Sequence, residues 1–374
     1  MRGRACAVVF FLLSAGALHC GARRRPTVPR IPSDMARAPN GEAIHAVAIA
    51  VGRGHACART AEGKVLCWGA NTSGQLGDGT RISRPRPVAV AGLDDADMLV
   101  TGDEHTCARR ARDQSLLCWG QNAHGELGDG TTDGRPTPAV VTDLHAVLSV
   151  SAAGHMTCAR KPNRYVLCWG EVHEGSAVKA PSPVFGMTET EEVATGALHA
   201  CARLADPASG RNVRCWGSNR LRQLGVPHLV DRGMPVDVPH LEKVTQLAAG
   251  REHTCARTEE GSVRCWGGGL RCVPGDWFEG KRVAVKPGAI PGMENVSLVA
   301  SGADQACAIL PDTTVACARE KSATGDRSCV SAPIASLRSV TALALGEEFS
   351  CALKRDGTVW CWSKNEPPTP VLQQ

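Results

Sequence analysis

The sequence lacks three features that would point to common function classes. No apolar stretch of 18 residues follows the N-terminal one, so no membrane-spanning helix is expected after it. The longest basic run is Arg23–Arg25 and the formal net charge is only +5, which argues against a nucleic-acid partner. No Cys-x-x-Cys spacing occurs, which argues against the common zinc motifs.

Cysteine, by contrast, is abundant, with 18 in 374 residues. That content is several times ordinary usage, and so many thiols are not expected in a reducing cytosol unless they hold a metal. We therefore expect an oxidising, extracytoplasmic location. The protein would be secreted, periplasmic or anchored to the outer membrane of a bacterium.

The N-terminus agrees with export. Residues 1–19 resemble a signal peptide, because Arg2 and Arg4 precede an apolar run that ends at Leu18. Cleavage is expected near residues 17–20, with two alternatives. In the first, ordinary cleavage releases the chain. In the second, Cys20 is lipidated at a lipoprotein box, which His19 matches poorly because the box needs a small residue just before the cysteine. The lipid would then be the only membrane contact. Residues 20–43, rich in arginine and proline, are expected to be a disordered linker.

The main feature of residues 44–374 is a unit that recurs about every 43 to 54 residues. Each copy has an apolar strand, Gly-x-x-His-x-Cys-Ala, a turn, a second strand and Cys-Trp-Gly. In the first copy these are Gly52–Ala58 and Cys67–Gly69. Seven copies are present, and their leading and trailing cysteines are Cys57 and Cys67, Cys107 and Cys118, Cys158 and Cys168, Cys201 and Cys215, Cys255 and Cys265, Cys307 and Cys317, and Cys351 and Cys361.

The spacing within a copy predicts a disulfide across a hairpin. If the turn centres on Glu62, Cys57 and Cys67 stand opposite each other with Cα atoms about 4.5 Å apart, within disulfide range. The alternatives are free buried thiol pairs or cysteine–histidine metal sites. Cys272 and Cys329 follow the trailing cysteines of adjacent copies, and they either bridge neighbouring blades or stay free thiols.

These motifs, together with Cys-Trp-Gly-x-Asn and the segment Gly74–Thr80, resemble the regulator of chromosome condensation repeat. The resemblance covers the chain from about residue 44 onward, and we interpret the chain as a bacterial exported member of that family. It implies an all-β, seven-bladed β-propeller with four-stranded blades of about 50 residues. Ala46–Gly52 and Thr369–Leu372 are expected to complete one blade together, so that pairing of N- and C-terminal strands closes the ring.

Several conspicuous residues have a structural explanation. His55, His105, His199 and His253 share one repeat position, which suggests a ring of metal ligands. That ring is incomplete, because the other three copies have Met156, Gln305 and Phe349 there. We therefore expect hydrogen bonding between strands, with the repeated tryptophans packing between blades and the Gly-Asp-Gly-Thr segments forming tight turns.

No nucleophile, carboxylate pair or metal triad occurs at a unique position. The sequence therefore predicts no catalytic residue, cofactor or metal, and a protein that is not an enzyme. Departures from the repeat are the places to look for a binding site. The clearest are the sixth copy, with Cys317-Ala318-Arg319, and the segment Arg271–Lys281, where Trp277 and Phe278 form a candidate contact patch or else pack an ordinary long loop.

The function that we expect is an exported, monomeric, non-catalytic scaffold. It would bind a protein, peptide or glycan partner through blade loops. The resemblance also suggests a guanine-nucleotide exchange factor, against which export argues, or a secreted inhibitor like the bacterial propeller that blocks β-lactamases. An exported enzyme would need a catalytic constellation that the sequence does not reveal.

Overall fold

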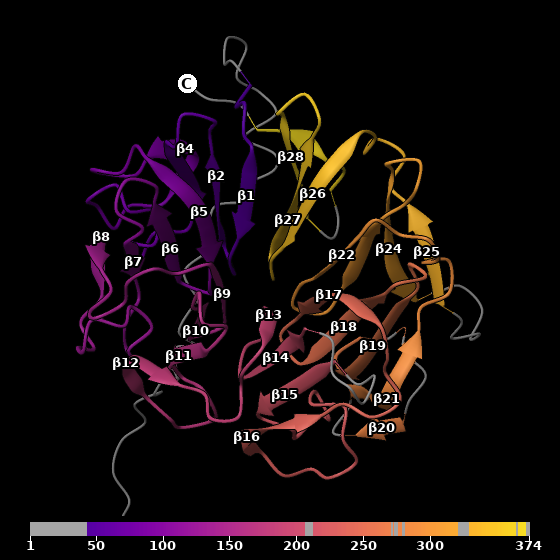
Figure 1. Ribbon diagram of the computed structural model, residues 1–374. Helices are drawn as coiled ribbons and strands as arrows, with labels where there is room; N and C mark the ends of the chain where they lie inside the picture. The colour runs from indigo at the N-terminus through magenta and orange to yellow at the C-terminus, as the bar shows by residue number, and fades with distance from the viewer. Residues whose placement is uncertain are drawn as a thin grey trace, which may run out of the picture.

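A computed structural model describes residues 43–205, 212–270, 272, 276–278, 281–320, 329–363 and 366–371. These residues form 29 strands and no helix. The strands make seven antiparallel sheets arranged as blades around a central axis, as Figure 1 shows. The predicted seven-bladed β-propeller is therefore confirmed. Within the described residues there is no helix of the length and apolarity that a membrane crossing requires.

Each blade is one continuous stretch of chain, and its first strand is nearest the axis. Blade 1 has β1 (Ala48–Val51), β2 (His55–Arg59), β3 (Val65–Gly69) and β4 (Arg84–Ala89); blade 2 has β5 (Ala96–Thr101), β6 (His105–Arg110), β7 (Leu116–Gly120) and β8 (Arg135–Val140). Blade 3 has β9 (Ser149–Ala153), β10 (Met156–Arg160), β11 (Val166–Gly170) and β12 (Val178–Pro183); blade 4 has β13 (Thr190–Thr195), β14 (His199–Leu204), β15 (Val213–Gly217) and β16 (Arg232–Asp237). Blade 5 has β17 (Val244–Ala249), β18 (His253–Thr258), β19 (Val263–Gly268), β20 (Asp276–Phe278) and β21 (Lys281–Ala289); blade 6 has β22 (Leu298–Ser301), β23 (Ala306–Ile309), β24 (Val315–Glu320) and β25 (Cys329–Pro333); blade 7 has β26 (Val340–Leu345), β27 (Phe349–Lys354), β28 (Val359–Ser363) and β29 (Thr369–Pro370).

The disulfides cross the hairpin of the second and third strands of every blade. The leading and trailing cysteines of each copy are opposed in register, as Cys57 and Cys67 are in β2 and β3. The seven bonded pairs are those expected from the repeat, with Cα–Cα distances of 4.0–4.1 Å. All fourteen residues are buried. Each blade therefore contains a disulfide that links two strands of its own sheet.

The glycine of Cys-Trp-Gly marks a bulge. In blades 1 to 5 the register between the third and fourth strands shifts at this glycine. Gly120 has φ +105°, and a Cβ there would lie 2.5 Å from the carbonyl oxygen of Glu104. Only glycine tolerates both conditions. In blade 6, Arg319 replaces the glycine and β24 pairs with β25 without a register shift.

Pairing of the two ends of the described chain closes the ring, as expected. The ends do not complete a single blade, however, because blades 1 and 7 are each built from consecutive strands. Instead, the segment before β1 reaches blade 7: His45 forms a bridge with Thr358, and the N–H groups of Ile44 and Ala46 donate to the carbonyls of Val371 and Gly357. Figure 1 shows β1 beside β26 where the ring closes.

The hydrophobic core lies between blades, as predicted for the tryptophans. Trp119 is fully buried and packs with Cys57, Val65 and Leu76 of blade 1. Its indole N–H donates to the carbonyl of Gln75 at 2.9 Å. Trp169 and Trp266 make the same bond to Glu126 and Gln223 of the preceding blades. The tight turns are also present, since Asp78 accepts hydrogen bonds from the N–H and hydroxyl of Thr80.

The repeated histidines join neighbouring blades by hydrogen bonds. Nε2 of His55 lies 2.9 Å from Oγ1 of Thr106, whose hydroxyl donates to the carbonyl of Gln75. A hydroxyl has one hydrogen, so Thr106 accepts from Nε2–H of a neutral His55. His105 with Thr157, and His199 with Thr254, repeat the contact at 2.9 Å. Gln305 bonds Ser350 in the same way, whereas Met156 packs in one cluster with Ala200 and Phe349 in one with Ala56.

Removal of one threonine hydroxyl should destabilise the ring. Thr106→Ala leaves Nε2–H of His55 buried without an acceptor, and we expect a loss of about 1–3 kcal/mol in the free energy of unfolding. Chemical denaturation monitored by tryptophan fluorescence measures it. The matched control is Ala306→Thr, because Ala306 occupies in blade 6 the position that Thr254 has in blade 5. Both ring nitrogens of His253 lack a partner among the described groups, so the new hydroxyl would give His253 an acceptor. A gain in stability there and a loss in Thr106→Ala are expected; equal stability of Thr106→Ala and the wild type contradicts the interpretation.

Candidate functional site: the front face

The loops of the propeller emerge on two faces. In an antiparallel blade, the connections between the first and second strands and between the third and fourth strands emerge at the same end. We call this end the front face. It carries the Gly-x-x-His segment and the long loop after Cys-Trp-Gly of each blade. The opposite end, the back face, carries the turns within the disulfide-bonded hairpins and the connections between blades.

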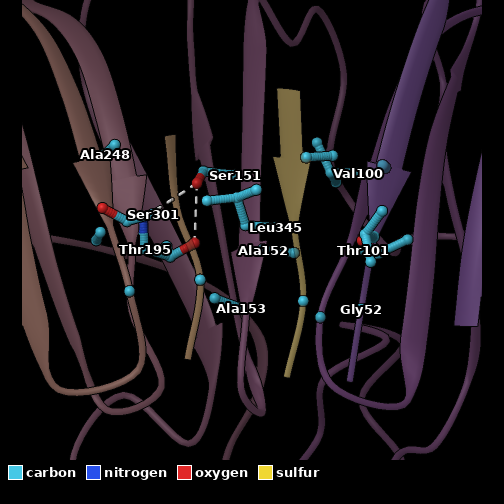
Figure 2. A pocket seen from close by; sticks show the side chains of 18 of the residues that line it. Gly52, Val100, Thr101, Ser151, Ala152, Ala153, Thr195, Ala248, Ser301 and Leu345 are labelled. Atoms are coloured by element: carbon cyan, nitrogen blue, oxygen red, sulfur yellow. Dashed lines mark hydrogen bonds between the residues drawn. The ribbon is translucent and has the colours of Figure 1, made fainter. Parts of the chain in front are cut away.

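A central channel of about 330 Å³ is lined by the first strand of every blade. Its wall consists mainly of small side chains, and Figure 2 shows Ala152, Ala153 and Ala248 around it. Ser151 and Thr195 are joined by hydrogen bonds across blades 3 and 4, with a hydroxyl–hydroxyl distance of 2.8 Å. Among the residues that the structure describes, the charged ones that line this channel all belong to its front mouth. The channel wall itself therefore offers a ligand few charged contacts.

Ion pairs link distant blades at the front mouth of the channel. Arg251 of blade 5 contacts Glu347 of blade 7 and lies 3.7 Å from Asp103 of blade 2. Arg53 of blade 1 also contacts Glu347, at 3.3 Å. Burial raises the pKa of Asp103, and the neighbouring Arg251 offsets part of that effect. The mouth is thus a mixed-charge surface whose groups neutralise one another.

Backbone hydrogen bonds run around the same mouth. Arg53 N–H donates to the carbonyl of Asp103, and Asp103 N–H donates to that of Gly154. Further around the mouth, the N–H of Arg251 donates to the carbonyl of Gly302. The N–H of Glu348 donates to the carbonyl of Arg53 and so joins blade 7 to blade 1. This belt fixes the loops of the front face relative to one another. A partner that docks there would meet a preorganised surface.

A second cavity, of about 380 Å³, opens beside the channel over blades 2 to 5. Its wall combines acidic and basic side chains with Leu198 and Leu221. Arg220 and Glu174 form an exposed ion pair of 3.2 Å at this cavity. Large apolar side chains are also exposed in front-face loops, since Ile82 and Val230 are each 61% exposed. The front face therefore has the hollow, mixed-polarity character of a binding surface.

One group of side chains at this cavity departs from the repeat. His124, His155 and Glu171 offer ligand atoms that lie within 4.8 Å of one another. The rings of His124 and His155 stack with centroids 4.8 Å apart. His124 Nδ1 lies 3.7 Å from a carboxylate oxygen of Glu171, and His155 Nδ1 lies 3.3 Å from Oε1 of the buried Glu126. Contact with Glu126 raises the pKa of His155.

The residues singled out in the sequence lie elsewhere. Trp277 and Phe278 belong to β20, which adds a fifth, outermost strand to blade 5, so the segment is not simply a loop. Their side chains lie outside the described residues, and the contact patch stays a prediction. Cys272 is disulfide-bonded, while the side chain of Cys329 is not described. The predicted signal peptide (1–19), with Cys20 and all but the last residue of the predicted linker (20–43), also lies outside the described part.

Comparison with known proteins identifies the class of repeat. The regulator of chromosome condensation (RCC1) repeat matches residues 46–75, 62–109, 113–160, 244–270 and 340–366. The chain is 30% identical over 246 residues to the ultraviolet-B receptor UVR8 of Arabidopsis thaliana, covering 61% of this chain and 55% of that protein. It is 28% identical over 262 residues to the human E3 ubiquitin-protein ligase HERC2, covering 68% of this chain and 4% of that protein.

Solved structures agree on the fold. Prp20p from Saccharomyces cerevisiae superposes with a TM-score of 0.70 at 19% identity, over 84% of this chain and 87% of that one. Human WBSCR16 gives 0.60 at 20% identity, over 71% and 72%. The protein is thus a seven-bladed β-propeller, and RCC1 repeats match segments of five of its blades. It spans about half the length of UVR8 and a small fraction of HERC2, so their activities are not transferred to it.

Proposed function

We propose that the protein is an exported, non-catalytic scaffold that binds a protein, peptide or glycan through the loops of its front face. The observation that carries export is the buried disulfide in each of the seven blades. Such bonds form and persist in oxidising compartments, and a reducing cytosol would keep these thiols reduced. The signal-like N-terminus supports the same compartment.

The front face supports the binding role. It combines a preorganised belt of backbone hydrogen bonds, a cavity of about 380 Å³ and exposed apolar side chains in two loops. The charged groups of the channel mouth neutralise one another, which suits recognition of a partner better than proton transfer. The function therefore resides in surface loops held by a rigid ring.

Intact mass tests export. We would express residues 1–374 in a bacterial host, recover the protein from outside the cytoplasm and measure its mass after alkylation without reduction. Loss of the N-terminal segment and at least fourteen unreactive cysteines are expected. Added lipid mass would identify anchoring at Cys20. An uncleaved, cytoplasmic chain with alkylated thiols would contradict the proposal.

A pair of charge reversals tests the face. Arg220→Glu alters the front cavity, and Arg112→Glu alters an arginine of similar exposure at the β6–β7 turn of the back face. Each arginine is ion-paired and exposed, so stability should change by about 1 kcal/mol or less in both variants. Partners cross-linked to the wild type outside the cytoplasm should be retained by Arg112→Glu and lost from Arg220→Glu. Loss from Arg112→Glu alone would assign binding to the back face.

A further inference from the structure

We propose that His124, His155 and Glu171 form a binding site for a divalent transition-metal cation of the zinc type, on the wall of the front-face cavity. Imidazole nitrogen and carboxylate oxygen are ligands that Zn²⁺ accepts at about 2.0–2.2 Å. Hard cations such as Ca²⁺ and Mg²⁺ prefer oxygen ligands alone. The ligand atoms already lie within 4.8 Å of one another, and all three side chains are partly exposed, so rotamer adjustments can bring them to a common cation.

The residues of the site are those at which blades 2 and 3 depart from their neighbours. His124 occupies the position that Ser73 has in blade 1. There the hydroxyl of Ser73 donates to Glu104 at 2.7 Å, so the ordinary contact at this position is a single hydrogen bond between blades. In blades 2 and 3 the two stacked imidazoles replace it. Two nitrogen ligands thus face each other where the repeat needs only a serine and a glutamate.

The carboxylate of Glu126 is also more than the turn requires. Glu126 Oε2 accepts the N–H of His124 at 2.8 Å, and Gln75 and Gln223 make the same turn bond through an amide oxygen. The negative charge of Glu126 therefore has another role. Its Oε1 lies beside Nδ1 of His155. In metal sites the ring nitrogen of a histidine that does not bind the metal commonly donates its N–H to a carboxylate. If Nδ1 of His155 faces Glu126 in this way, Nε2 of His155 is left to bind the cation.

Hydrogen bonds hold Glu171 in place and leave one carboxylate oxygen available to a cation. Its backbone N–H donates to the carbonyl of His155 at 2.9 Å, which fixes the spacing of these two residues. Its Oε1 accepts the N–H of Gly175 at 3.1 Å, while Oε2 faces His124. With neutral histidines, Glu126 and Glu171 give the site two negative charges, which a dication would balance. His155 and Glu171 line the cavity, so the remaining coordination positions are open to water or to a partner's anionic group.

Zinc binding by the oxidised, full-length protein tests the site. Protein treated with a chelator, then exposed to Zn²⁺ and passed through gel filtration, should retain one equivalent by elemental analysis. Competition with a fluorescent zinc chelator would give the dissociation constant. Ca²⁺ in excess should not displace the metal. Retention of less than one equivalent by the wild type would overturn the proposal.

Four variants assign the ligands. His124→Ser, which restores the residue of blade 1, and Glu171→Gln should abolish stoichiometric retention. Glu126→Gln keeps the turn bond but should weaken Zn²⁺ binding by about 10- to 100-fold, as expected of a carboxylate that orients a ligand. The matched control, His145→Ser, removes an exposed histidine of the back face and should bind like the wild type. Equal binding by His124→Ser and the wild type would assign the metal to adventitious surface histidines, which would overturn the proposal.

Discussion

Reduction of the disulfides is expected to unfold the whole propeller. Each bond closes a loop of about 10 to 14 residues in sequence separation and should contribute about 2–4 kcal/mol. Seven such contributions exceed the total stability of about 5–15 kcal/mol that folded proteins commonly have. Because the cysteines are buried, reductant reaches them only after a blade opens, so loss of structure should be slow. Near-ultraviolet circular dichroism, with alkylation of samples taken over time, follows both events.

A single-blade variant serves as the control. The double replacement Cys307→Ala with Cys317→Ala removes the bond of blade 6 alone and should cost about 2–4 kcal/mol while the ring stays folded under oxidising conditions. Cooperative unfolding of the fully reduced, alkylated chain at the same denaturant concentration as the oxidised protein would contradict this account. The core between blades would then carry the stability alone.

Mild acid is expected to destabilise the oxidised protein. Burial lowers the pKa of His55, His199 and His253 to about 3 and that of His105 to about 4, from an ordinary value of 6.5. As the pH falls below 6.5, these histidines bind protons in the unfolded chain but stay neutral in the folded chain. The contribution of these histidines is therefore complete above about pH 6.5 and is lost as the pH falls toward 3 to 4. Each should cost about 1.4 kcal/mol per pH unit within that window.

Denaturation profiles between pH 4.5 and 7.5 measure this effect. We expect stability to fall by several kcal/mol between pH 6.5 and 4.5, although Asp103, Glu192 and Glu348, whose pKa values are raised by burial, offset part of the loss. His253→Met is the matched variant, because His253 meets Ala306 of the next blade at the repeat position where Met156 meets Ala200. Its pH dependence should be weaker by about one histidine's share. A flat wild-type profile would show that the buried histidines take up protons without unfolding.

The fold and the disulfides were predictable because they depend on local, repeated geometry. A hairpin with Cys57 and Cys67 equidistant from its turn opposes the two residues whatever surrounds it. Pairing of the two ends was predictable as well, but the strands involved were not, because the pattern does not reveal whether the last strand pairs inside its own blade. In the structure β29 pairs with β28 inside blade 7, and the described segment before β1 crosses to blade 7.

The candidate metal site could not be predicted from motif spacing. His124 and Glu171 are 47 positions apart and belong to loops of different blades, so their meeting depends on the angle between two packed sheets. A usable signal existed nonetheless. Alignment of the seven copies shows His124 where Ser73 stands, Glu126 where Gln75 stands and Glu171 where Ala70 stands. Three such departures that converge on one boundary between blades would have marked it.

The pairing of side chains across blade boundaries limits how such a protein can be rearranged by recombination. His55 requires the hydroxyl of Thr106, whereas Met156 and Phe349 pack in clusters with Ala200 and Ala56. A blade transplanted to another position would set an imidazole against a methyl group, or a bulky apolar side chain against a hydroxyl. Because each such boundary would lose about 1–3 kcal/mol, the seven modules are not interchangeable. Duplication of a blade would keep its full stability only together with a compensating change in its new neighbour.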